Sequence, residues 1–467
     1  MTRLLFINPC LRPGAKRKYP PVGLACVMTA VEKAGFAFDL IDMDAEDMSM
    51  AELRAKLKSE RYDICGLGCI VTALRLVKEI AAIVRQENPE CLIMAGNSVA
   101  TSIPELLLRN TDVDVAVMGE GDITTVEFVQ AVAAGQDWRS TRGIALLQDG
   151  GLVLTTPQPI IEDLDSIGFP NWDLFALHKY NEGMLKLTMN ESDGEQVVFP
   201  LNAARGCPFS CTFCYHVFKG QKYRKYSESL VMQEFLRLSK QYGATFIQFW
   251  DELTFPNIAS VERMVANLER LDFVTQWEGV SRCNLFSRKD SDLIRRMRDC
   301  GCRSIAFSIE NASPEILAAM NKHVSHDKTV EHALALWEGG VTPLTSIIFG
   351  YPQETPQTIR QTLELCERCN IFPSVGYLQP LPGTPVYAWA LESGAIKDEY
   401  AYLMNAGDRQ DFHVNLTGMP TGELIGCVQD GMRELARRMG LSFKDPLKTG
   451  VYQKPKQPQP DGSVQGE

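Results

Sequence analysis

The chain has 467 residues, 45% of them hydrophobic and 22% charged, which is typical of a soluble globular protein with two or three domains. Its net charge of −11 gives no reason to expect binding to nucleic acid. The sequence shows no N-terminal signal peptide and no apolar run of membrane-spanning length, so we expect no transmembrane segment and a cytoplasmic location. Fourteen cysteines in such a chain indicate reduced thiols and cluster ligands rather than a disulfide framework.

Residues 1–135 alternate strand-like and helix-like segments, which predicts an α/β fold with a doubly wound parallel sheet. The strand candidates are residues 4–9, 38–42, 62–68, 91–97 and 113–121. Ligands of such sheets bind at the carboxyl ends of the strands, where this sequence places its glycine-containing turns. At each turn, the alternative is that the glycine serves only the backbone geometry.

Residues 136–195 are predicted to be a linker with short β pieces, and residues 196–390 alternate again. Six strand candidates lie at 197–203, 245–251, 276–282, 304–310, 343–350 and 374–380. Helical stretches separate them, which predicts an incomplete (β/α)6 parallel barrel with functional residues at the C-terminal strand ends. We expect a small, mostly helical C-terminal region at 391–450 and a disordered tail at 451–467.

Three cysteines, Cys207, Cys211 and Cys214, follow the first barrel strand with the spacing C-x3-C-x2-C. Cysteine thiolates are the usual ligands of a [4Fe–4S] cube. Three close thiolates can hold three irons and leave the fourth open to a small molecule, as an open zinc position binds water or substrate. The alternative is a zinc site, for which His216 is the candidate fourth ligand.

This spacing, with the aromatic Phe213 just before the last cysteine, resembles the radical S-adenosylmethionine (SAM) superfamily. The resemblance implies that the open iron takes the amino and carboxylate groups of SAM. An electron from the cluster then splits the sulfonium bond and yields methionine and a 5′-deoxyadenosyl radical, which removes hydrogen from an unactivated C–H. It also implies an electron donor such as flavodoxin or ferredoxin, and a small-molecule or peptide substrate.

The resemblance implies SAM contacts around the cluster loop and at later strand ends. Glu252 lies where the superfamily often has Gly-Gly-Glu, although this chain has Trp-Asp-Glu, and Arg282 can clamp a carboxylate. For each charged residue the alternative is a salt bridge at the barrel rim. The residues expected to contact SAM are Phe213, Tyr215, Glu252, Arg282, Ser308, Glu310 and Gly350.

The N-terminal sheet resembles the cobalamin-binding domain that is joined to many radical SAM barrels, so that the resemblance covers roughly residues 1–440. The residues expected to contact cobalamin are Gly23, Gly68, Thr72, Gly96, Asn97, Gly119, Glu120 and Gly121. Residues 1–177 contain no histidine, so the Asp-x-His-x-x-Gly cobalt ligand of methionine-synthase-type domains is missing. The lower face of the cobalt would be empty, or filled by water or another side chain.

This family includes methyltransferases of unactivated carbon or phosphorus and the anaerobic magnesium-protoporphyrin monomethyl ester cyclase. Our leading hypothesis is a cobalamin-dependent radical SAM methyltransferase. The alternatives are a cobalamin-dependent cyclase, oxidase or rearrangement enzyme, a radical SAM enzyme that has lost cobalamin, and an iron–sulfur electron carrier or redox sensor. The last is less favoured because electron-transfer clusters usually have four cysteine ligands. A second pair, Cys366 and Cys369, is interpreted as buried thiols, with an auxiliary cluster as the alternative.

Overall fold

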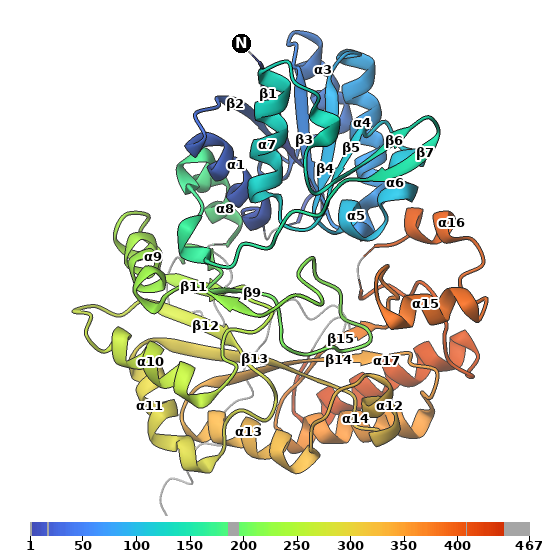
Figure 1. Ribbon diagram of the computed structural model, residues 1–467. Coiled ribbons are helices and arrows are strands. Elements are labelled where there is room, and N and C mark those ends of the chain that lie inside the picture. Colours follow the sequence, from blue (N-terminus) through green and yellow to red (C-terminus); the bar gives the residue numbers. More distant parts are fainter. Residues whose placement is uncertain (1, 16–17, 185–195, 408, 443–467) are drawn as a thin grey trace, which may run out of the picture.

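The computed structural model describes residues 2–15, 18–184, 196–407 and 409–442. Figure 1 shows two sheets with their helices, one above the other, and a helical C-terminal part beside both. The predicted tail at 451–467 lies outside the described residues. None of the helices within the described ranges has both the length and the apolar character needed to cross a bilayer.

The upper unit in Figure 1 is built on a seven-stranded sheet of order β2-β1-β3-β4-β5-β6-β7. The first five strands in this order run parallel, as predicted, and β6 and β7 add to the edge in antiparallel pairing. The strands are β1 (Leu4–Asn8), β2 (Phe38–Asp42), β3 (Ile64–Gly68), β4 (Leu92–Gly96), β5 (Val115–Val117), β6 (Ile144–Gln148) and β7 (Gly151–Leu154). The sheet therefore continues beyond residue 135, into the stretch that the sequence assigned to the linker.

Helices cover both faces of this sheet, as a doubly wound fold requires. They are α1 (Val22–Lys33), α2 (Met43–Glu46), α3 (Met50–Lys58), α4 (Leu74–Glu87), α5 (Asn97–Ser102), α6 (Pro104–Asn110) and α7 (Gly121–Ala133). The apolar face of α4 shows why the pattern forms a helix here: its buried residues recur every three or four positions along the chain.

The segment between the two sheets packs against both domains. Phe169 stacks on Tyr226 of the barrel with ring centroids 4.5 Å apart, while the Asn171 side-chain amide donates to Glu32 of α1 at 2.9 Å. Helix α8 (Leu177–Met184) returns to the first sheet, where the buried Tyr180 hydroxyl donates to Asp42 at 2.5 Å. The segment thus holds the two domains together instead of separating them.

The lower unit is a curved six-stranded parallel sheet of order β15-β14-β13-β12-β11-β8, which confirms the predicted half-barrel. Its strands are β8 (Val198–Leu201), β11 (Phe246–Phe249), β12 (Gln276–Val280), β13 (Cys302–Glu310), β14 (Thr342–Phe349) and β15 (Ser374–Tyr377). The surrounding helices are α9 (Glu228–Lys240), α10 (Ile258–Leu268), α11 (Ser291–Asp299), α12 (Pro314–Ala319), α13 (His326–Glu338) and α14 (Pro356–Arg368). A short antiparallel ribbon, β9 (Ala204–Arg205) with β10 (Arg224–Lys225), was not predicted.

The C-terminal region contains α15 (Pro385–Glu392), α16 (Glu399–Met404) and α17 (Thr421–Arg438). Helix α17 packs along α14 of the barrel, whereas α16 contacts α4 of the first domain. At the latter contact, the Lys78 ammonium donates to the Tyr400 hydroxyl at 2.7 Å. This region therefore spans the domain interface on the side opposite α8 in Figure 1.

Candidate functional site

A cavity of about 890 Å³ lies between the two sheets, at the carboxyl ends of strands from both. Residues that follow β1, β3, β4 and β5 line it from one side, and residues that follow β8, β11 and β15 line it from the other. Both fold classes bind ligands at the carboxyl edge of the sheet, and here both domains turn that edge toward the same cavity. All eight residues expected to contact cobalamin line this cavity, and so do Tyr215 and Glu252.

Two glycines of the first domain leave open space at the cavity wall, where a corrin would meet no side chain. A Cβ added to Gly23 or Gly119 would meet no atom within 4 Å and would project into open space. Gly119 has φ +70°, a left-handed conformation that favours glycine. Asn97 adopts φ +65°, and its side chain accepts from the Ser98 N–H at 2.6 Å. Asparagine is one of the few residues that tolerates this conformation.

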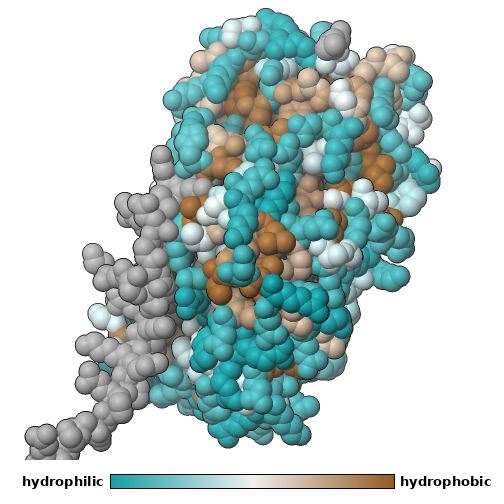
Figure 2. Space-filling model, turned by 90° about the vertical axis from the view of Figure 1, so that its left-hand side faces the viewer, coloured by the Kyte–Doolittle hydropathy of each residue, from teal (hydrophilic) through white to brown (hydrophobic). Residues whose placement is uncertain are grey.

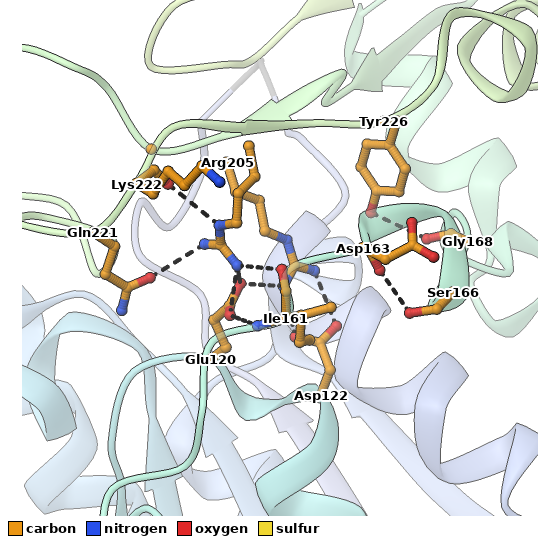
Figure 3. Close-up of polar contacts among 12 residues, drawn as sticks. Glu120, Asp122, Ile161, Asp163, Ser166, Gly168, Arg205, Gln221, Lys222 and Tyr226 are labelled. Carbon is orange, nitrogen blue, oxygen red and sulfur yellow. Dashed lines mark hydrogen bonds and ion pairs between the residues drawn. The ribbon is translucent and has the colours of Figure 1, made fainter.

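Glu120 has a role that the sequence did not predict. Its carboxylate accepts hydrogen bonds from the guanidinium groups of Arg205 and Arg224 and from the Ile161 N–H at 2.9 Å (Figure 3). The side chain is nearly buried and both of its oxygens are engaged by the protein. Glu120 therefore lines the cavity, while its charge is used in an ion pair with the barrel domain.

The cysteine loop runs from residue 206 to residue 223, between β9 and β10. Cys207 and Cys211 are partly exposed, Cys214 is exposed, and all three are free thiols. The loop is tied down by protein contacts, since the Lys219 ammonium donates to the carbonyls of Cys211 at 3.2 Å and Cys214 at 2.5 Å. Loss of hydration around the sulfur and the neighbouring loop thiols raise the pKa of Cys214, so binding iron must displace a proton from this ligand.

Cys207, Cys211 and Cys214 lie near enough to one another that a charge on one sulfur raises the pKa of another. Within the described residues, no three His, Cys, Asp or Glu side chains converge on the position of a single metal ion. His216, the candidate fourth zinc ligand, lines the cavity, and its Nδ1 has no hydrogen-bond partner in the described part of the chain. A cube holds its ligands at separate corners and therefore does not need them to converge on one point.

Three of the charged residues expected to bind SAM surround the cysteine loop. Glu252 accepts from the Gly206 N–H at 3.2 Å, one residue before the first cysteine. Arg282 lies 3.8 Å above the ring of Phe209 in the same loop and interacts electrostatically with Cys207. Glu310 interacts in the same way with Cys214. The structure therefore brings the loop together with residues 46 to 96 positions further along the sequence.

Glu310 pairs with Lys322 at 3.1 Å, and both side chains are nearly buried. The Lys322 ammonium also donates to the Ser308 carbonyl at 2.6 Å. The second Glu310 oxygen, Oε2, is buried without a hydrogen-bond partner among the described residues, which leaves it able to accept from a ligand. The salt bridge expected as the alternative role for Glu310 is thus present with Lys322, and it occupies only one of the two carboxylate oxygens.

The remaining SAM candidates, like Arg282 and Glu310, do not line the cavity. Phe213 packs against Tyr351 at a centroid distance of 6.4 Å, and the Ser308 and Ser346 hydroxyls are 2.9 Å apart. Gly350, at φ +111°, donates its N–H to Glu354 at 3.2 Å. Cys366 and Cys369 are fully buried in the apolar core, as expected for packing thiols.

Sequence reasoning missed the residues that join the two halves of the site. Arg205 and Arg224 bind the first domain, and Trp250 meets Tyr19 edge to face, with ring centroids 4.8 Å apart. The position of Arg205 directly before Gly206 and Cys207 could have drawn attention to it. Nothing in the sequence distinguishes Arg224 from the other arginines.

Comparison with known proteins agrees with this architecture. Residues 14–129 match the B12 binding domain family, and residues 201–366 match the radical SAM superfamily. The chain is therefore a radical SAM protein with an N-terminal B12-binding domain.

Two curated relatives show how far the similarity extends. An uncharacterized methyltransferase of Pyrococcus horikoshii is 26% identical over 84% of both chains. The anaerobic magnesium-protoporphyrin IX monomethyl ester cyclase of Rubrivivax gelatinosus is 28% identical over 79% of this chain and 66% of its own.

Two solved structures share the fold. The radical SAM methyltransferase TsrM from Kitasatospora setae, with cobalamin and a [4Fe–4S] cluster bound, superposes with a TM-score of 0.67 at 18% identity over 85% of this chain and 76% of its own. The cobalamin-dependent SAM radical enzyme OxsB superposes with a TM-score of 0.67 at 14% identity over 95% of this chain and 62% of its own.

Proposed function

We propose that this protein is a cobalamin-dependent radical SAM methyltransferase that acts on an unactivated carbon of a small-molecule or peptide substrate. The observation that carries the proposal is the cavity between the carboxyl ends of both sheets, which would hold a corrin from one domain directly opposite the cysteine loop of the other. When bound, the cluster would supply the electron that cleaves SAM, and cobalamin would carry the methyl group.

The roles of the protein's own residues follow from their positions. Cys207, Cys211 and Cys214 hold three corners of the cluster and leave the fourth for SAM. Glu252, whose pKa is raised by burial, accepts from the SAM amino group, and Arg282 pairs with the SAM carboxylate. The free oxygen of Glu310 accepts a further hydrogen bond from SAM.

The substrate would enter through an apolar part of the cavity. Leu11, Ile70 and Trp250 are large apolar side chains that line the cavity and are 37–47% exposed. On the face shown in Figure 2, apolar side chains come to the surface about halfway down, at the level where the two domains meet in Figure 1. An exposed apolar rim beside a deep cavity is typical of a ligand entrance.

The first test is the cobalt-to-protein ratio after anaerobic purification from cells supplied with cobalamin. We expect about one cobalt per chain. The loaded protein is then incubated with SAM, reduced flavodoxin and a candidate substrate. Methyl transfer predicts S-adenosylhomocysteine beside 5′-deoxyadenosine. A ratio near zero with an intact cluster would contradict the role of cobalamin and favour a radical SAM enzyme that has lost it.

A second candidate function is cyclisation or oxidation with the same cofactors, because cyclases are among the relatives of this chain. In that case 5′-deoxyadenosine would form without S-adenosylhomocysteine. The electron-carrier alternative is not favoured, since the curated relatives described above are a methyltransferase and a cyclase and the loop leaves one iron corner open. A flavodoxin or ferredoxin as donor, and the cytoplasmic location, stay predictions.

A further inference from the structure

The cysteine loop is closed at its base by two arginines that face each other. Strands β9 and β10 pair in antiparallel register, with Arg205 directly opposite Arg224. Arg205 is therefore the residue immediately before the loop, and Arg224 is the residue immediately after it. Like charges directly opposite in a ribbon repel, so this closure needs counter-charges.

The counter-charges come from the other domain. Arg205 donates to both Asp122 oxygens, at 2.9 and 3.0 Å, and to Glu120 at 2.9 Å. Arg224 donates to both Glu120 oxygens, at 3.0 and 2.9 Å, and to the Ile161 carbonyl at 2.7 Å. All four side chains are no more than 9% exposed. Figure 3 shows Arg205, Glu120 and Asp122 gathered between the domains. We call these three residues and Arg224 the latch.

The latch borders both cofactor sites. Glu120 belongs to the turn at 119–121, which lines the cavity, and Asp122 follows it in the first turn of α7. Arg205 is separated from Cys207 by one glycine. Asp122 and Arg205 also line the cavity themselves. A displacement of the turn at 119–121 therefore also displaces Arg205, the residue immediately before the cysteine loop.

We infer that Arg205 and Arg224 are positioning residues, which couple cobalamin binding at the turn 119–121 to assembly of the iron–sulfur cluster in the loop 206–223. The inference rests on the proposed function, since it takes both cofactors as ligands of this chain. Each cofactor requires its own element to be in place, and the latch fixes the two elements relative to each other. Bound cobalamin should therefore increase the affinity for the cluster, and the bound cluster should increase the affinity for cobalamin by the same factor.

The test compares equilibrium binding of hydroxocobalamin to the cluster-free and the cluster-reconstituted full chain, under anaerobic conditions. We expect the dissociation constant to be lower by at least about fivefold when the cluster is present, the lower end of typical coupling between sites. In Asp122→Asn and Glu120→Gln, which keep shape but remove charge, the ratio of the two constants should fall to about one.

The matched control is Glu162→Gln. Glu162 faces Lys222 of the same loop at 3.8 Å, but this pair is 66–75% exposed and should contribute little. In this variant, the ratio of the hydroxocobalamin dissociation constants without and with the cluster should equal that of the native chain. A loss of coupling in Glu162→Gln as large as in Asp122→Asn would overturn the inference.

A second measurement covers the case in which the latch variants do not fold. Residues 206–214 do not line the cavity, so hydroxocobalamin would not touch them directly. In the cluster-free native chain, hydroxocobalamin should slow hydrogen exchange at these amides by at least about fivefold. Unchanged exchange, or equal affinities in both cluster states, would overturn the inference and leave the proposed function standing. A chain that binds no hydroxocobalamin at all would overturn both.

Discussion

Gly383 lies against the ring of Tyr215, so closely that a Cβ at position 383 would be 2.7 Å from the Tyr215 ring atom Cε2. Tyr215 lines the cavity directly after the last cysteine of the loop. Its ring is therefore held in place by a glycine from the segment that follows β15. This contact links the last strand of the barrel to the wall of the cofactor site.

We expect Gly383→Ala to push the Tyr215 ring toward the cavity and to weaken hydroxocobalamin binding by about tenfold, a loss of about 1.4 kcal/mol. Binding is measured by titration followed in the visible absorption spectrum. Gly394→Ala is the matched control, because Gly394 has φ +74°, similar to the +82° of Gly383, but has no atom within 4 Å of an added Cβ. Both variants should lose about 1–2 kcal/mol of stability to backbone strain, and only Gly383→Ala should lose affinity.

Replacement of a loop cysteine should remove the cluster. After anaerobic reconstitution of Cys207→Ala, Cys211→Ala or Cys214→Ala, we expect iron and sulfide contents well below those of the native chain, and no SAM cleavage. Cys427→Ala, a partly buried cysteine of α17, is the control and should reconstitute normally. SAM cleavage that survives in the loop variants would contradict the radical SAM mechanism.

Removing one partner of the buried Glu310–Lys322 ion pair should destabilise the fold strongly. Lys322→Met leaves the Glu310 carboxylate buried without its cation, which should lower the free energy of unfolding by about 3–5 kcal/mol. Arg438→Met breaks a pair with Glu367 whose side chains are 36–40% exposed, and should cost about 0–1 kcal/mol. Urea unfolding of both variants checks the difference, and equal losses would show that Lys322 is not required to compensate Glu310.

Asp251 should make stability depend on pH. Burial raises the pKa of this carboxyl to about 7, well above its value of about 3.9 in an unfolded chain. The folded chain thus retains a proton that the unfolded chain loses. The contribution of Asp251 to the free energy of unfolding is therefore fully present below pH 4 and is lost as the pH rises to 7. Between pH 4 and pH 7 the native chain should lose more stability than Asp251→Asn does. The difference should reach a few kcal/mol, at about 1.4 kcal/mol per pKa unit.

The comparison uses thermal unfolding at several pH values with both proteins in the same cofactor state. Asparagine keeps an oxygen that can accept from the Ala204 N–H, as Asp251 does at 2.9 Å, so the strand end should remain intact. Parallel pH profiles for the two proteins would show that Asp251 does not titrate in this range.

Periodicity in the sequence was sufficient to predict the two parallel sheets, because each buried strand is a short apolar run followed by a helix. The strand candidate at 276–282 corresponds to β12 (Gln276–Val280), and that at 38–42 to β2. The pairing of β6 with β5 and of β7 with β6 was not predicted, since an antiparallel hairpin at a sheet edge breaks the alternation of strands and helices.

The candidate site was predictable where chemistry depends on local spacing, as for the three cysteines and the glycine turns. It was not predictable where it depends on contacts between distant segments. Arg224 lies 104 positions from Glu120, and only the docking of the two domains brings them together. The sequence likewise gave no sign that the Glu120 carboxylate, expected at a cofactor, is engaged by two arginines.

The face-to-face arrangement of the two sheets also determines the local electrostatics of the cavity. A helix that follows a parallel strand begins at the carboxyl edge, and the first residues of α1 and α7, Val22 and Gly121, both line the cavity. The amino ends of helices carry a partial positive charge that attracts phosphate and carboxylate groups. A chain with a net charge of −11 thus offers anionic parts of its cofactors a pair of favourable backbone dipoles.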